Sequence, residues 1–187
     1  MSGRFAIAAT PLNGVVVVSR ARIEDARGSL SRFFCAVELG AVGWKKSIAQ
    51  INMSTTDLKG TIRGMHFQRP PAAEMKLVTC IKGEIFDVAV DLRASSPTFL
   101  KWHGERLSAE NGRALMISEG FAHGFQTLTD DVELLYCHSA SYVPFHEGGV
   151  RADDPTLAIQ WPLSTSAMSV RDRSHPLIGP KFAGIEI

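Results

Sequence analysis

Two histidines stand among glycines, in segments where an imidazole could meet a ligand. His66 ends the segment Gly60-Thr-Ile-Arg-Gly-Met-His66, and His123 lies within Gly120-Phe-Ala-His-Gly124. Glycine lets the backbone approach a ligand closely, and imidazole titrates near about pH 6.5, so it can take up or release a proton at neutral pH. Each histidine alone could equally be a satisfied packing residue. The alternative is a ligand pocket with acid–base chemistry.

Arg63 precedes His66 by three residues, so in a regular strand the two side chains would face opposite sides. A bulge at Gly64 would bring both to one side. Two further segments carry polar side chains on strands that are otherwise apolar: Asp87 and Asp91 in 84–92, and Tyr136, His138 and Tyr142 in 132–142. A barrel interior lined in this way is a pocket rather than a packed core. His103, His146 and His175 have polar surroundings and are interpreted as surface residues.

Short strand patterns predominate and must position these residues. They recur at regular spacing and are separated by turn signals such as Lys82-Gly83 and Asn111-Gly112. The patterns cover residues 15–23, 76–82, 84–92, 99–107, 114–117, 124–128 and 132–142. The clearest helical candidate is Ser31–Val37, and the stretch from Pro144 onward is expected to be irregular. This spacing predicts an all-β antiparallel sandwich or barrel with few short helices.

Composition sets the class of protein. The chain has 187 residues, 45% of them hydrophobic and 21% charged, which indicates one globular domain over 1–187. Its net charge of +1 argues against a nucleic-acid or membrane-surface binder, and apolar runs such as Phe5–Ala9 are far shorter than the ~20 residues of a membrane span. Three cysteines without paired spacing favour a reducing, cytoplasmic location.

A metal-dependent cupin is one alternative for the two histidine segments. Such a site usually needs a His-x-His pair, a carboxylate and a further histidine. Here Gln68 stands where the second histidine of the pair would be, which leaves His66, His123 and Glu74 as scattered candidates. Glutamine is a poor ligand for transition metals, so the sequence favours a pocket without metal.

Taken together and in order, the segments resemble the dTDP-4-dehydrorhamnose 3,5-epimerase family, from about Gly14 to Asp172. The matching residues are Gly60–Gln68, Lys76–Val78, Gly83–Arg93, Ser96–Phe99, Leu107–Asn111, Gly120–Phe125, Tyr136, Tyr142–Pro144, Glu147, Asp154–Pro155 and Ile159–Pro162. The resemblance implies a cupin-type jelly roll that uses no metal or other cofactor. It also implies a homodimer in which the N-terminal region, residues 1–45, contributes to the partner's pocket.

The resemblance assigns four catalytic residues. It makes His66 the base that removes a sugar proton and Asp172 the carboxylate that orients and charges it. Tyr136 matches the acid that returns a proton from the opposite face, and Lys76 would stabilise the oxyanion. Carbons 3 and 5 of a 4-keto sugar both flank the carbonyl, so each proton can leave through an enolate. Inversion needs a second group on the other face, and tyrosine can serve if the site lowers its pKa.

Substrate contacts are implied for ten further residues. Tyr142 would stack on the thymine, and Arg27 would contact the nucleotide diphosphate across the dimer. The others are Arg32, Gln50, Asn52, Arg63, Asp87, His123, Glu147 and Arg171. The substrate would be a nucleotide sugar, most simply dTDP-4-dehydro-6-deoxy-D-glucose, converted to dTDP-4-dehydro-L-rhamnose.

Several positions depart from the family pattern. Leu30 replaces an aromatic residue and Arg32 an acid, both at the nucleotide end, while Cys137 replaces a lysine. Ser118 and Ala152 replace a proline and an aromatic residue. These departures leave the nucleotide and the sugar open. A 3- or 5-only epimerase, a non-catalytic nucleotide-sugar binder and a metal-dependent cupin stay as alternatives.

Overall fold

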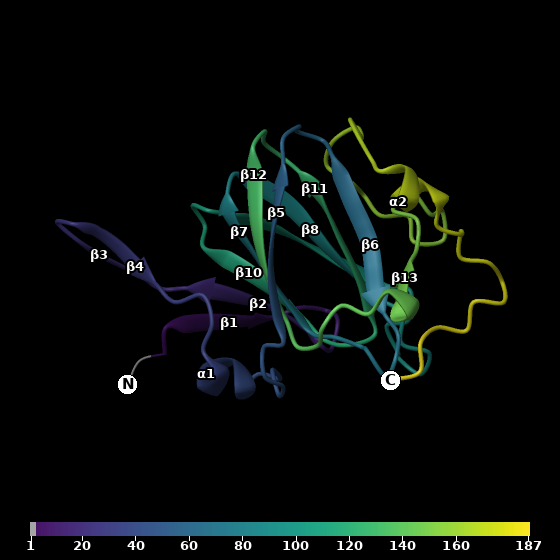
Figure 1. Ribbon diagram of the computed structural model, residues 1–187, viewed down its shortest axis with the longest axis horizontal. Coiled ribbons are helices and arrows are strands. Elements are labelled where there is room, and N and C mark those ends of the chain that lie inside the picture. Colours follow the sequence, from purple (N-terminus) through teal and green to yellow (C-terminus); the bar gives the residue numbers. More distant parts are fainter. Residues whose placement is uncertain (1–2) are drawn as a thin grey trace.

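In the computed structural model, residues 3–187 form two antiparallel sheets and a projecting hairpin (Figure 1). The six-stranded sheet has the order β1 (Phe5–Ala9), β2 (Val15–Arg20), β10 (Arg113–Ile117), β7 (Lys76–Lys82), β12 (Val132–His138) and β5 (Gln50–Thr56). The five-stranded sheet has the order β13 (Glu147–Gly149), β6 (Ile62–Gln68), β11 (Phe121–Thr127), β8 (Glu84–Asp91) and β9 (Trp102–Ser108). The hairpin pairs β3 (Arg22–Asp25) with β4 (Gly28–Ser31).

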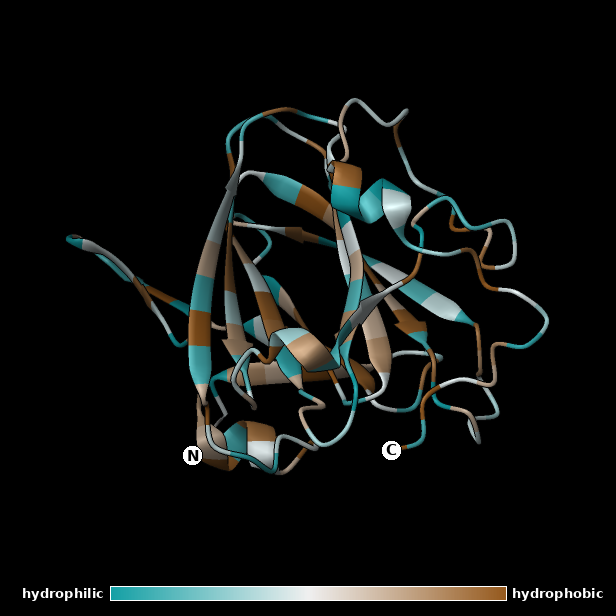
Figure 2. Ribbon diagram, turned by 45° about the vertical axis from the view of Figure 1, so that its right-hand side comes forward, coloured by the Kyte–Doolittle hydropathy of each residue, from teal (hydrophilic) through white to brown (hydrophobic). Residues whose placement is uncertain are grey.

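The main core lies between the two sheets, because strands of both sheets turn apolar residues inward. Val78 and Leu134 come from the six-stranded sheet, and Ile85 and Phe125 from the five-stranded sheet. Polar and apolar residues alternate along many of the strands (Figure 2). The predicted all-β, cupin-type sandwich is confirmed.

Strand β8 is buried on both faces. Ile85 and Ala89 pack into the core between the sheets, whereas Val88 and Val90 pack beneath the C-terminal segment with Leu157. The segment after Pro144 has little regular structure, as the sequence predicts, and it covers the outer side of this sheet. It includes η1 (Pro144–His146) and α2 (Val170–Ser174).

The predicted helix Ser31–Val37 is wrong in its bounds. Ser31 pairs with Arg22 at the end of the hairpin, and α1 covers Ala36–Gly40 instead. Only Leu39 of α1 is buried, and it packs with Trp44 on the outer face of the six-stranded sheet. No helix within residues 3–187 is both long enough and apolar enough to cross a lipid bilayer.

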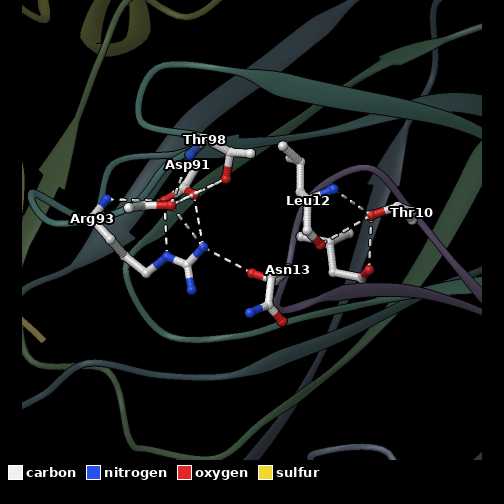
Figure 3. Close-up of polar contacts among 8 residues, drawn as sticks. Thr10, Leu12, Asn13, Asp91, Arg93 and Thr98 are labelled. Atoms are coloured by element: carbon white, nitrogen blue, oxygen red, sulfur yellow. Dashed lines mark hydrogen bonds and ion pairs between the residues drawn. The ribbon is translucent and has the colours of Figure 1, made fainter.

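A buried carboxylate joins the loop after β8 to the turn between β1 and β2 (Figure 3). Asp91, fully buried, accepts hydrogen bonds from Arg93 Nε at 2.9 Å and Thr98 Oγ1 at 2.6 Å. Arg93 Nη2 also donates to the Asn13 carbonyl at 2.8 Å. Burial alone would raise the pKa of Asp91, but these hydrogen bonds hold it below its ordinary value. The carboxylate is therefore ionised and fastens two chain segments together.

Candidate active site

A cavity of about 530 Å³ lies between the two sheets and opens beside the edge strand β5. Residues of β5, β7 and β12 line one side, and residues of β6 and β11 line the other. Tyr142 and Glu147, from the segment after β12, complete its wall. Nine of the predicted site residues line it: Gln50, Asn52, Arg63, His66, Lys76, His123, Tyr136, Tyr142 and Glu147. Asp172 lies behind His66 and is hydrogen-bonded to it.

His66 and Asp172 form a hydrogen-bonded pair at this cavity. His66 Nε2 lies 2.7 Å from Asp172 Oδ1, and the carboxylate is only 4% exposed. The Ser169 hydroxyl caps α2 by accepting from the Asp172 backbone N–H at 3.0 Å. This bond fixes the backbone position from which the Asp172 side chain extends. Burial would raise the pKa of Asp172, but the hydrogen bond from His66 outweighs it and keeps the pKa low. The ionised aspartate therefore accepts the Nε2–H of His66 and fixes the tautomer and orientation of the imidazole.

The β6 bulge places Arg63 and His66 together, as the sequence predicts. Gly64 has φ +129°, and the pairing of β6 with β11 shifts register at this point. A Cβ at Gly64 would lie 2.5 Å from Gly124 Cα, so the two strands approach too closely for any side chain. Both Arg63 and His66 consequently line the cavity.

Tyr136 projects from β12, in the sheet opposite that of His66. Its hydroxyl lies 3.2 Å from Ser54 Oγ, and its ring lies between those of His123 and His138, with centroids 6.1 and 6.0 Å away. Burial raises the pKa of Tyr136, whereas the sequence argument requires a lowered one. The phenol is thus held protonated, as a proton donor must be. Once it has given up its proton, the resulting phenolate needs positive charge nearby.

His123 is held by Asp87 through a 2.7 Å bond from its Nε2. Asp87 has no exposed surface and is not among the residues that line the cavity. Asp87 therefore does not reach the cavity as the predicted substrate contact requires, because the carboxylate lies behind His123. Its second oxygen is buried and unpartnered among residues 3–187.

Lys76 extends from β7 into the cavity, where Glu74 balances its positive charge. Its Nζ donates to the His66 carbonyl at 3.3 Å and lies 3.3 Å from Glu74 Oε1. The side chain is about nine-tenths buried, so the ammonium is confined rather than solvated. One of its three N–H groups is left for an oxygen of a bound ligand.

The mouth of the cavity carries the predicted nucleotide contacts. Tyr142 is 49% exposed and donates its hydroxyl proton to Glu147 Oε2 at 2.6 Å. Arg171 forms an ion pair with the same glutamate. Gln50 and Asn52 are hydrogen-bonded to each other at 3.0 Å, and Gln50 also accepts from the Tyr142 backbone N–H. An exposed aromatic ring beside amide groups suits a base that is half in water.

Arg27 and Arg32 do not reach this cavity. Arg27 lies in the projecting hairpin, 90% exposed and paired with Asp25 at 2.6 Å. Arg32 follows the hairpin and forms an ion pair with Glu38. Within one chain neither residue can contact a ligand of the cavity, so their substrate contacts stay predictions that require a second subunit.

Two contributors to the site, Ser54 and His175, were missed by the sequence interpretation, and His138 was expected at the pocket but given no role. Ser54 follows Gln50 and Asn52 at alternate positions of β5, and that alternation is the signal that could have found it. His175, interpreted as a surface residue, instead packs its ring over Gly149 with its Nε2 buried, 5.8 Å from the His66 ring. Burial lowers the pKa of His175, which keeps the ring neutral.

The suggested metal trio does not assemble. Glu74 is hydrogen-bonded to His138, and His123 is hydrogen-bonded to Asp87, so both are engaged with other partners. A different group, His66, Asp172 and His175, places its ligand atoms within 4.8 Å of one another. In that group the His66 and Asp172 atoms already satisfy each other through their hydrogen bond.

Fold and site define a class: a cupin-type β-sandwich with a histidine–carboxylate pair and a tyrosine on opposite sides of one cavity. The family model described as dTDP-4-dehydrorhamnose 3,5-epimerase matches residues 9–179, and the chain belongs to this family.

Individual relatives agree with that assignment. The dTDP-4-dehydrorhamnose 3,5-epimerase of Shigella flexneri is 47% identical over 142 residues, 76% of each chain. A dTDP-4-dehydrorhamnose 3-epimerase of Streptomyces niveus is 44% identical over 138 residues, 74% of this chain and 66% of that one. The structure of a Legionella pneumophila 3,5-epimerase in complex with dTDP-4-keto-L-rhamnose superposes with a TM-score of 0.88 at 36% identity, covering 92% of each chain.

Proposed function

We propose that this chain is an isomerase that inverts carbons 3 and 5 of dTDP-4-dehydro-6-deoxy-D-glucose, giving dTDP-4-dehydro-L-rhamnose. Family membership supports the reaction class and the nucleotide-sugar substrate. The observation that carries it is the placement of His66, which is bonded to Asp172, and Tyr136 in opposite sheets around one cavity. Inversion at a carbon requires a base on one face of the ligand and an acid on the other.

The proposed steps involve proton transfers alone. His66 removes the proton from a carbon beside the keto group, and the C–H electron pair forms a C=C bond as the carbonyl electrons move to oxygen. Lys76 and Arg63 stabilise that oxyanion, an interaction whose loss typically costs ~3–4 kcal/mol. Tyr136 then donates its proton to the opposite face of the carbon, and the carbonyl reforms.

For the nucleotide, we propose that Tyr142 stacks on the base and that Gln50 and Asn52 contact it from the neighbouring edge strand. Glu147, held by Tyr142 and Arg171, fixes the orientation of that ring. His123 faces the sugar and phosphate, with Asp87 setting its tautomer from behind.

We further propose that residues 1–187 form one domain that works as a homodimer, with residues 1–45 completing the partner's cavity. The exposed strand β1 and the projecting hairpin with exposed Ile23 and Leu30 are suited to such a contact, and Arg27 and Arg32 would act there. The three unpaired cysteines suit a cytoplasmic location.

The test is incubation with a panel of 4-keto nucleotide sugars in heavy water, with deuterium located by NMR. We expect deuterium at carbons 3 and 5 of the dTDP sugar, together with inverted product. Deuterium at carbon 3 alone would match the 3-epimerase relative instead, and deuterium at carbon 5 alone would indicate a 5-epimerase. Absence of any exchange would leave a non-catalytic binder, and activity lost on chelation with stoichiometric bound metal would indicate the metal-dependent alternative.

A further inference from the structure

The cavity contains a third histidine–carboxylate pair, beyond His66–Asp172 and His123–Asp87. His138 Nδ1 lies 2.9 Å from Glu74 Oε2, and both side chains are about nine-tenths buried. His138 lines the cavity, and its Nε2 has no hydrogen-bond partner among residues 3–187. An imidazole oriented through one nitrogen and open at the other is the arrangement of a proton-transfer group.

Glu74 ties this histidine to Lys76. Its Oε1 lies 3.3 Å from Lys76 Nζ while its Oε2 holds His138, so one carboxylate orients both groups. Lys76 and His138 are also direct partners in the pairing of β7 with β12. An oxygen that meets the Lys76 ammonium therefore lies beside His138 as well.

Glu74 accepts from His138 Nδ1, which leaves Nε2 as the ring nitrogen that can exchange a proton with a ligand. Glu74 is ionised, because the hydrogen bond from His138 and the charge of Lys76 lower its pKa more than burial raises it. The other groups around His138 are the Lys76 cation, the neutral Tyr136 ring stacked on it and Gln50 opposite it on β5. Glu74 thus contributes the one negative charge in this set.

We propose that His138 is a catalytic acid of this reaction, acting on the oxygen of the keto group while Glu74 positions it. This rests on the proposed function. As His66 takes the carbon-bound proton and the carbonyl electrons move to oxygen, His138 Nε2–H gives its proton to that oxygen and forms the enol. When Tyr136 protonates the carbon, the enol O–H bond breaks and His138 recovers the proton, so the cycle balances.

The direct test is His138→Gln, whose amide can still bond to Glu74. We expect kcat to fall roughly 10²-fold, the typical contribution of a positioned acid, with KM changed less than about threefold. Solvent exchange and inversion should fall together, because forming the enol is the step that is lost. His103→Gln is the matched control, since His103 lies on β9, outside the cavity, and should leave both rates unchanged.

Glu74 supplies a second, independent variant. Glu74→Gln leaves His138 in place but removes the carboxylate that accepts from its Nδ1 and orients the ring, so kcat should again fall with KM nearly constant. Glu74→Asp should recover part of that loss, which a purely structural role would not predict. If His138→Gln does not fold, as judged by thermal unfolding, the Glu74→Gln result decides the proposal.

A kcat within twofold of wild type for His138→Gln overturns the proposal. So does a rise in KM with kcat unchanged, which would make His138 a binding contact only. Exchange that persists while inversion is lost would assign His138 to the second protonation. A wild-type protein that exchanges no deuterium would overturn the proposed function itself, whereas active wild type with unaffected His138 and Glu74 variants overturns this inference alone.

Discussion

At the scale of single residues, the site depends on carboxylates that each hold one imidazole. His66 and Asp172 are 106 positions apart in the chain, and His123 and Asp87 are 36 apart, yet both pairs meet at 2.7 Å. In each pair the aspartate is almost fully buried and the histidine faces the cavity. The tautomer and orientation of the rings are therefore set before a ligand binds.

Tyr142 offers a residue-scale prediction about the nucleotide. We expect Tyr142→Ala to raise substrate KM by roughly 5- to 150-fold, because base stacking on an aromatic ring contributes ~1–3 kcal/mol. Steady-state kinetics with the dTDP substrate measure this. Tyr142→Phe is the control, since it keeps the ring and loses only the bond to Glu147. An unchanged KM for Tyr142→Ala would exclude the stacking assignment.

At the scale of elements, the Asp91–Arg93 cluster at the end of β8 controls stability rather than chemistry. Asp91→Asn leaves the Arg93 guanidinium half-buried without its charge partner, so unfolding should require ~3–5 kcal/mol less free energy. Chemical denaturation at neutral pH measures the change. Lys101→Asn, an exposed substitution on the following loop, serves as the control and should change stability by less than about 0.5 kcal/mol.

The same cluster gives a pH dependence. The pKa of Asp91 is lower in the folded protein than the ordinary value near ~3.9, so its contribution is complete above that value and is lost as the pH falls through the folded pKa. Wild type should accordingly lose stability below about pH 4 more steeply than Asp91→Asn does. Parallel acid profiles for the two proteins would contradict the assignment.

The elements also show what the sequence could and could not predict. The glycine at 64 predicted the bulge that brings Arg63 to His66. The burial of both faces of β8 was not predicted, because it depends on the C-terminal segment that covers the outer side of the sheet. The helix was misplaced because Ser31 is recruited into the hairpin by pairing with Arg22. His138 and Glu74 were missed as a pair because they are 64 positions apart and meet only where the end of β12 lies beside the start of β7.

At the scale of the whole molecule, one chain leaves the cavity open to solvent beside the exposed Tyr142, and Arg27 and Arg32 do not line it. We expect a dimer in solution, with a light-scattering mass near twice 20.4 kDa. Arg27→Ala should raise KM for the dTDP sugar without changing the mass. Arg22→Ala, in the same hairpin, is the control against which the change in KM is compared. A monomer with full activity would contradict a shared cavity.

The central claim is that His66 and Tyr136 act on opposite faces of the same carbon, and deuterium exchange in the two variants tests it most directly. His66→Ala should abolish both exchange and inversion, because no enolate forms. Tyr136→Phe keeps the base and the ring, so it should still introduce deuterium with retained configuration while inverted product falls by ~10²–10⁴-fold. Asp172→Asn should lower exchange and inversion together, by less than His66→Ala. Equal loss of exchange and inversion in Tyr136→Phe would contradict the two-face mechanism.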